Sequence, residues 1–192
     1  MTPHPAPAGS PAAVLVPGMR EASSEHWQAI LAAGLPGARQ VTPLGRTLRD
    51  VSEHVAALQG TLSDIAGPVI LVAHSAGVIT TVHWASGHRG QVVGALLATP
   101  PDLVTPLAAE YPSLDELADH GWLPVPTDPL PFPSILATSA DDPLSDPARI
   151  RAFGNAWGSD VREIGAVGHL NPASGYGEWP DAQRLLDELR DM

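Results

Sequence analysis

The sequence predicts a single domain of the α/β class, with a mostly parallel six-stranded sheet that has helices on both faces. Short apolar runs alternate along the chain with segments whose apolar residues recur at helical spacing, a pattern typical of parallel sheets. The apolar runs are continuous, as expected for strands that are buried on both faces. The chain has 192 residues, of which 44% are hydrophobic, which is enough for one domain with a full core.

The first expected strand is residues 12–16, a continuous apolar run that ends at Pro17-Gly18. A helix is expected over residues 24–33, where apolar residues recur at helical spacing and Gly34 provides a stop. A short second strand is expected at residues 40–43.

The next helix is expected to begin at Thr47, because Thr47 and Asp50 resemble an acidic capping box. Its apolar residues share one helix face: Val51, Val55, Leu58 and Leu62. Residues 69–73 form the third expected strand, and a helix is expected after it, over residues 78–86.

The second half of the chain supplies three more expected strands, at residues 92–98, 134–139 and 161–167. A helix is expected over residues 146–157, because an aspartate suited to the N-cap is followed by proline at the first helical position. The last helix is expected over residues 181–190.

The junction between the third expected strand and its helix is the pentapeptide Ala73-His74-Ser75-Ala76-Gly77. A serine on a sharp strand-to-helix turn is the nucleophile elbow of the α/β-hydrolases. Alanine replaces the more common first glycine, and its side chain is small enough for the turn. The pattern predicts that Ser75 is a nucleophile, the alternative being a structural serine in a phosphate-type loop.

The α/β-hydrolases carry a catalytic triad in the chain order serine, acid, histidine. Downstream of Ser75, Asp141-Asp142-Pro143 follows the fifth expected strand and His169 follows the sixth. Both candidates stand just past a carboxyl end of the sheet, where ligands gather in parallel folds. Taken alone, the aspartates could belong to a turn and His169 could be a structural loop residue. Their order and positions together favour a triad, with Asp141 or Asp142 as its acid.

Residues 99–133 interrupt the alternation of strands and helices, and the segment is too long for an ordinary connection. A capping box at Ser113 and Glu116 predicts a short helix inside it. We expect a minimal cap over the site, with a structural surface loop as the alternative. The candidate pocket residues are Tyr111, Leu114, Leu117 and Trp122 in this segment and His26 outside it.

Composition narrows the possible partners. The formal net charge of −11 argues against nucleic acid or an anionic membrane as a partner, because both require a basic face. The chain has no cysteine, which excludes disulfides, zinc–thiolate sites and a cysteine nucleophile and fits a cytoplasmic location. The histidines lack the spacing of a zinc motif, so no metal site is expected.

The proline-rich residues 1–11 lack the apolar core of a signal peptide, and we expect them to be a disordered lead-in. The single domain then covers residues 12–192. No apolar run approaches the length that crosses a bilayer, and the sequence leaves the oligomeric state open.

With these residues placed, the chain resembles the small serine-hydrolase family of YdeN and retinoblastoma-binding protein 9, from Val14 to about Leu186. The motifs that carry the resemblance are Val16-Pro17-Gly18, His26-Trp27-Gln28, Ala73-His74-Ser75-Ala76-Gly77, Leu130-Pro131-Phe132-Pro133-Ser134, Ser139-Ala140-Asp141-Asp142-Pro143, Gly168-His169-Leu170-Asn171 and Ser174-Gly175-Tyr176-Gly177-Glu178-Trp179-Pro180. The last motif is unusually specific.

The resemblance implies a compact α/β-hydrolase fold with strand order 2-1-3-4-5-6 and a catalytic triad of Ser75, Asp142 and His169. The family pattern places the catalytic acid directly before proline, hence Asp142 rather than Asp141. The chain departs from the family at Ala73, and without cysteine it cannot present the L-x-C-x-E type of peptide to which part of the family name refers.

The expected chemistry is hydrolysis of a small ester, amide or related acyl substrate through an acyl-enzyme on Ser75, without a cofactor. The backbone N–H groups of Ala76 and Met19 are the expected oxyanion donors. Two alternatives remain open from the sequence. One is acyl transfer, or lactone or thioester processing, in a biosynthetic pathway, and the other is a non-catalytic binding module.

Overall fold

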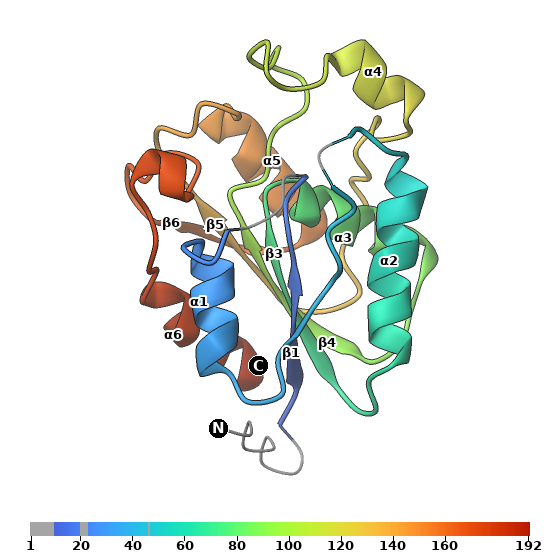
Figure 1. Ribbon diagram of the computed structural model, residues 1–192, viewed down its shortest axis with the longest axis vertical. Helices are drawn as coiled ribbons and strands as arrows, with labels where there is room; N and C mark the ends of the chain where they lie inside the picture. The colour runs from blue at the N-terminus through green and yellow to red at the C-terminus, as the bar shows by residue number, and fades with distance from the viewer. Residues whose placement is uncertain (1–9, 20–22, 46) are drawn as a thin grey trace.

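The computed structural model describes residues 10–19, 23–45 and 47–192, and these form one six-stranded sheet in the order β2-β1-β3-β4-β5-β6 (Figure 1). Every neighbouring pair of strands is parallel. The strands are β1 (Ala12–Val16), β2 (Arg39–Gln40), β3 (Val69–His74), β4 (Val92–Ala98), β5 (Ser134–Thr138) and β6 (Asp160–Glu163). The predicted fold class and strand order are therefore confirmed.

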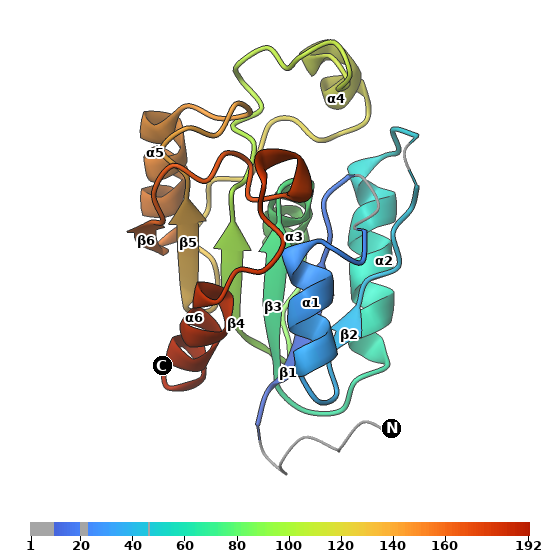
Figure 2. The same cartoon turned by 60° about the vertical axis from the view of Figure 1, so that its left-hand side comes forward.

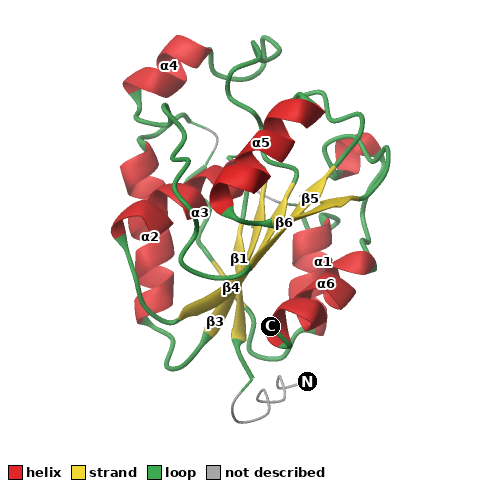
Figure 3. Cartoon of the chain, turned by 180° about the vertical axis from the view of Figure 1, so that it is seen from behind, coloured by secondary structure: helices red, strands yellow, loops and turns green. Residues whose placement is uncertain are grey.

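Helices connect the strands and cover both faces of the sheet (Figures 2 and 3). They are α1 (Trp27–Gly34), α2 (Val51–Ser63), α3 (Ala76–Gly87), α4 (Leu114–Asp119), α5 (Pro147–Trp157) and α6 (Asp181–Arg190), with a short 3-10 turn at Pro172–Ser174. Helices α1 and α6 lie on one face, and α2, α3 and α5 lie on the other.

The burial of both faces of the central strands explains why their sequences are continuously apolar. In β3, Ile70 and Val72 belong to the core that includes α1 and α6, whereas Leu71 and Ala73 belong to the core that includes α2, α3 and α5. All four side chains are fully buried. Successive residues from Ile70 to Ala73 therefore enter opposite cores, and the one polar side chain of the strand is His74 at its carboxyl end.

The two edge strands of the sheet, β2 and β6, are shorter than the sequence predicted. Strand β2 has two residues, Arg39–Gln40, where residues 40–43 were expected, and β6 ends at Glu163 instead of Val167. Pro43 has no N–H for a ladder, and Gly165 adopts a positive φ of 89° that turns the chain out of the sheet.

Helix α2 begins at Val51, with Asp50 at its N-cap, so the expected capping box at Thr47 is wrong. The Asp50 side chain does not cap its own helix. Its carboxylate lies 2.7 Å from His120 Nδ1, and the Val51 N–H donates to the His120 carbonyl over 3.0 Å. A tertiary contact therefore sets the start of α2.

Residues 99–133, which we call the cap segment, contain α4, which lies above the carboxyl ends of the strands (Figures 1 and 2). The last part of the segment returns to the start of β5, and residues 126 and 128–130 lie beside the far end of α3. The predicted capping box between Ser113 and Glu116 is present. Residues 1–9 of the expected lead-in are outside the described residues. Within the described part of the chain, no helix has the length and apolar character needed to span a membrane.

Candidate active site

Ser75 stands between β3 and α3 in a strained backbone conformation. Its φ of 56° and ψ of −128° are rarely adopted by a residue with a side chain. Its N–H donates to the Ala98 carbonyl at the end of β4 over 3.0 Å. A Cβ at Gly77 would lie 2.3 Å from the Val16 carbonyl oxygen, so only glycine fits there, whereas the methyl group of Ala73 is fully buried in the core.

The three side chains predicted to form a triad meet in a row of hydrogen bonds. Ser75 Oγ lies 2.8 Å from His169 Nε2, and the other ring nitrogen, Nδ1, lies 2.9 and 3.0 Å from the two carboxylate oxygens of Asp142. The side chains of His169 and Asp142 are only 7% and 1% exposed. With Nδ1–H donating to the carboxylate, Nε2 is the acceptor that faces the serine hydroxyl.

The two neighbouring aspartates, Asp141 and Asp142, have different hydrogen-bond partners. This difference distinguishes the two candidates for the acid that the sequence left open. Asp142 contacts His169 and accepts from the Leu144 N–H at 2.9 Å. Asp141 accepts instead from the Gly168 N–H at 2.7 Å and from Ser139 Oγ at 2.9 Å. The hydrogen bond from Gly168, followed by that from Ser139, lowers the pKa of the Asp141 carboxyl. Asp141 therefore shapes the histidine loop without contacting the imidazole.

The loop that carries His169 is tied to the turn that follows it. The His169 N–H donates to Ser174 Oγ over 3.0 Å, and that hydroxyl donates to Asn171 Oδ1 over 3.1 Å. Gly168 has a φ of 55°, and a Cβ there would lie 2.6 Å from Ser174 Oγ. These contacts account for the glycine, asparagine and serine of the two motifs in this region.

Two buried histidines lie beside the row of hydrogen bonds, of which the sequence suggested only His26, as a pocket residue. His74 Nε2 lies 3.0 Å from the His169 carbonyl oxygen, and the His26 ring lies 4.7 Å from the His74 ring. Burial, and to a smaller extent His169, lowers the pKa of His26 to about 4. Burial also lowers the pKa of His74 well below its usual value. No sequence pattern indicated the His74 contact, because its two residues are far apart in the chain.

An apolar cavity of about 30 Å³ lies between the cap segment and the start of α3. Its lining consists of Met19, Ala76, Pro101, Leu103, Leu107, Tyr111, Pro112, Leu117, Trp122 and Leu144. Of the candidate pocket residues, Tyr111, Leu117 and Trp122 line it, Leu114 packs against the same cluster without lining it, and His26 lies elsewhere, at the N-cap of α1.

Trp122 is a fully buried anchor of the cap segment as well as a wall of the cavity. Its Nε1–H donates to the Arg49 carbonyl over 2.9 Å, just before α2. Its own carbonyl lies 3.2 Å from His83 Nε2 on α3, and its ring packs against His54 at a centroid distance of 4.9 Å. These contacts hold the cap segment on the two helices beneath it.

The loop after β1 lies against the nucleophile. A Cβ at Gly18 would be 3.2 Å from Ser75 Cβ, so glycine allows the loop to approach the serine. Met19, which follows, and Ala76, the first residue of α3, both line the apolar cavity. The N–H groups of the first turn of a helix have no intrahelical acceptor, so the start of α3 suits a developing negative charge.

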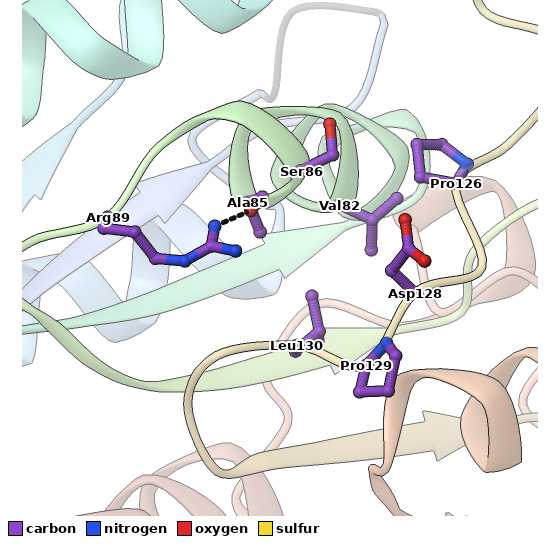
Figure 4. A pocket seen from close by; sticks show the side chains of 8 residues that line it. All are labelled: Val82, Ala85, Ser86, Arg89, Pro126, Asp128, Pro129 and Leu130. Atoms are coloured by element: carbon purple, nitrogen blue, oxygen red, sulfur yellow. Dashed lines mark hydrogen bonds between the residues drawn. The ribbon is translucent and has the colours of Figure 1, made fainter.

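A larger hollow of about 280 Å³ lies at the opposite end of α3, beside Arg89 and Asp128 (Figure 4). The Arg89 guanidinium donates to the Ala85 and His88 carbonyls over 2.6 and 2.7 Å. The rise of an α-helix puts Ser86 about 16 Å along the axis from Ser75, so the nucleophile cannot act on a group bound there. Over the described ranges, no three His, Cys, Asp or Glu side chains form a group suited to a metal ion.

A family model described as serine hydrolase matches residues 13–188, so the chain belongs to the serine hydrolase family. A protein described as a YdeN-like hydrolase of Pectobacterium atrosepticum is 26% identical, with a TM-score of 0.81 over 95% of this chain and 91% of that one. The ydeN product of B. subtilis is 17% identical, with a TM-score of 0.73 over 95% and 100%. The resemblance to YdeN-type α/β-hydrolases is therefore confirmed.

A more distant structure with the same fold is the type II thioesterase BorB from the borrelidin biosynthetic cluster. It is 18% identical, with a TM-score of 0.64 over 97% of this chain and 95% of that one. Among curated proteins, none matches this chain.

Proposed function

We propose that this serine hydrolase cleaves a small ester, amide or related acyl substrate through an acyl-enzyme on Ser75. The row of hydrogen bonds from Ser75 through His169 to Asp142 carries the proposal. It connects a hydroxyl on a strained elbow to a buried carboxylate through one imidazole, the arrangement that activates a serine for attack on a carbonyl.

In the first half of the reaction, Ser75 Oγ attacks the acyl carbon as its proton moves to His169 Nε2. The bond from oxygen to carbon forms, and the carbonyl electrons move to the oxygen. When the tetrahedral intermediate collapses, the leaving group departs with the proton from Nε2. Asp142, at 2.9 Å from Nδ1, keeps the imidazole in the required tautomer and stabilises its positive charge.

In the second half, water attacks the acyl-enzyme and gives its proton to His169 Nε2. The ester bond to Ser75 breaks, Oγ takes the proton back, and the carboxylic acid leaves. The proposed oxyanion donors are the backbone N–H groups of Ala76 and Met19, whose residues line the same cavity beside Ser75.

The apolar cavity indicates the acyl group. It lies next to Ala76, its lining contains no charged side chain, and its volume of about 30 Å³ leaves room for only a small group. A short uncharged hydrocarbon would gain from burial there, whereas a second carboxylate would lose its hydration without a partner. The proposed substrate is thus a small molecule with a short apolar acyl group. A cytoplasmic location stays a prediction from the sequence.

The proposal is tested with p-nitrophenyl esters of graded acyl length, matching thioesters, and a fluorophosphonate probe. The wild-type protein should be labelled at Ser75 and should hydrolyse short esters fastest. Ser75→Ala should lose labelling and turnover, by about 10⁴ to 10⁶ in rate, while its circular dichroism stays unchanged. Turnover that survives in Ser75→Ala would refute the acyl-enzyme. A wild-type protein that is neither labelled nor active would favour the binding module.

A further inference from the structure

Gln28 forms a buried link between the ends of two neighbouring strands. It is the second residue of α1 and is 2% exposed. Its side-chain Nε2 donates to the Val16 carbonyl over 3.1 Å and to the Val72 carbonyl over 2.9 Å. One amide group therefore uses both of its N–H donors on main-chain acceptors of β1 and β3.

These two carbonyls lie where β1 and β3 separate. The paired register of the two strands ends at Val16 and Ala73. Beyond this point β1 leads into the loop that contains Gly18 and Met19, while β3 continues into the elbow, where the Ser75 N–H donates to Ala98 on β4. The helix that follows β3 lies on the other face of the sheet from α1, so the connections that follow β1 and β3 diverge at this point.

The same two segments carry the proposed oxyanion donors. Met19 is three residues after Val16, and Ala76 is four residues after Val72. The segments also touch directly: Gly77 packs on the Val16 carbonyl, and Gly18 packs on Ser75. The separation of Val16 and Val72 thus controls how far the loop after β1 stands from the elbow.

We propose that Gln28 is a positioning residue that fixes the distance between the two oxyanion donors. This inference rests on the proposed function, and it assigns a role to the His26-Trp27-Gln28 motif, which the triad chemistry leaves unused. An amide bonded to both strands resists their separation. An apolar side chain of the same length fills the space but leaves both carbonyls free to shift. A displacement of about 1 Å in such donors can cost a factor of about 100 in rate.

The test compares Gln28→Met with Gln91→Met. Gln91, which is half-buried just before β4, makes a single contact of the same kind far from the elbow, where its Nε2 donates to the Leu62 carbonyl of α2 over 2.6 Å. In Gln28→Met, kcat for a short p-nitrophenyl ester should fall about tenfold to a hundredfold with KM nearly unchanged, because the donors act in the transition state. The rate of fluorophosphonate labelling should fall in parallel, and the midpoint of the pH–rate profile should not move. Gln91→Met should keep the wild-type kcat.

Three results would overturn the inference: an unchanged kcat in Gln28→Met, an equal loss in Gln91→Met, or a rise in KM alone. If Gln28→Met does not fold, Gln28→Asn replaces it. The shorter amide still fits the space but cannot reach both carbonyls, so the same loss of kcat is expected. The Ser75→Ala variant distinguishes a failure of the inference about Gln28 from a failure of the proposed function. If Ser75→Ala is inactive and Gln28→Met is fully active, only the role of Gln28 fails, whereas an active Ser75→Ala refutes the proposed function.

Discussion

His74 Nε2 lies 3.0 Å from the main-chain carbonyl oxygen of His169, so the residue before the candidate nucleophile holds the loop of the candidate base. The imidazole is buried, and its pKa lies well below the usual value because of that burial. A neutral ring with its proton on Nε2 is a donor to this carbonyl. The contact joins β3 to the loop after β6.

We expect His74→Leu to lower kcat about tenfold and His74→Gln to restore most of it. The Gln amide nitrogen can occupy the position of Nε2 and donate to the same carbonyl, whereas leucine cannot donate. A typical hydrogen bond contributes about 1 kcal/mol, which corresponds to roughly a factor of five to ten when it is lost from the transition state. Kinetics with a short ester measure both variants. Equal activities of the two would show that the contact only fills space.

We expect Asp142→Asn to lower kcat by about 10⁴, because an amide at this position favours the wrong imidazole tautomer. Asp141→Asn is the matched control. It removes a charge one residue away, but the altered side chain contacts Gly168 and Ser139 and does not reach the ring. Its kcat should fall about tenfold at most, with a lower midpoint of thermal unfolding. The opposite ranking of the two variants would transfer the role of the acid to Asp141.

The sequence predicted the centre of the fold well because local pattern and burial agree there. The expected strand at residues 92–98 and the last helix at residues 181–190 match the observed β4 and α6. The start of α2 could not be predicted, since the Asp50 side chain is used by His120, 70 residues away. The predicted lengths of the edge strands β2 and β6 were wrong for a similar reason. An edge strand pairs on one side only, so the residue at which it ends depends on the loops around it.

In the candidate site, motif order predicted which side chains would meet. Each motif follows a strand, and the carboxyl ends of parallel strands meet at one edge. The contacts of His74, His26 and Gln28 were not predictable in this way. Those of Gln28 and His74 join residues from 12 to 95 positions apart through backbone carbonyls, which every residue carries, and His26 meets the ring of His74, 48 positions away. Trp122 was expected in the pocket, but its hydrogen bonds to Arg49 and His83 beneath the cap segment depend on tertiary packing.

We expect the stability of the protein to fall between pH 6.5 and about 4, partly through His26. Its pKa is about 4 in the folded protein, against a usual value of 6.5, because of burial and the nearby His169. In this range the unfolded chain binds a proton at His26 that the folded protein does not. The free energy of unfolding is therefore unaffected by His26 above pH 6.5 and decreases as the pH falls below that value. His74, buried against His26, acts in the same direction.

His26→Asn should reduce this dependence. His26 caps α1 by accepting from the Gln28 N–H, and asparagine provides an equivalent acceptor that does not titrate. Urea unfolding at pH 7, 6 and 5 should show a smaller decrease in the free energy of unfolding for the variant than for the wild type. A residual decrease should remain from His74. Parallel decreases in the two proteins would show that His26 does not contribute.

We expect the apolar cavity to limit acyl length, and Leu107→Ala to relax that limit. Leu107 lines the cavity, and its removal would enlarge a space that now has about 30 Å³. Leu114→Ala is the matched control, because Leu114 packs against the same cluster without lining the cavity. Each added methylene that enters an apolar site is worth about 0.8 kcal/mol. In Leu107→Ala, kcat/KM for butanoyl and hexanoyl esters relative to the acetyl ester should therefore rise about fourfold for each methylene accommodated.

The control separates a change of pocket shape from a loosening of the cap segment. Both substitutions remove the same atoms from this segment, so both should lower the midpoint of thermal unfolding, but only Leu107→Ala should change the order of preferred chain lengths. The rate of labelling by a small fluorophosphonate should stay near the wild-type value in both, because neither residue contacts Ser75, His169 or Asp142 through a hydrogen bond. If Leu114→Ala shifts the preference equally, the cap segment controls chain length through its overall packing and not through the lining of this cavity.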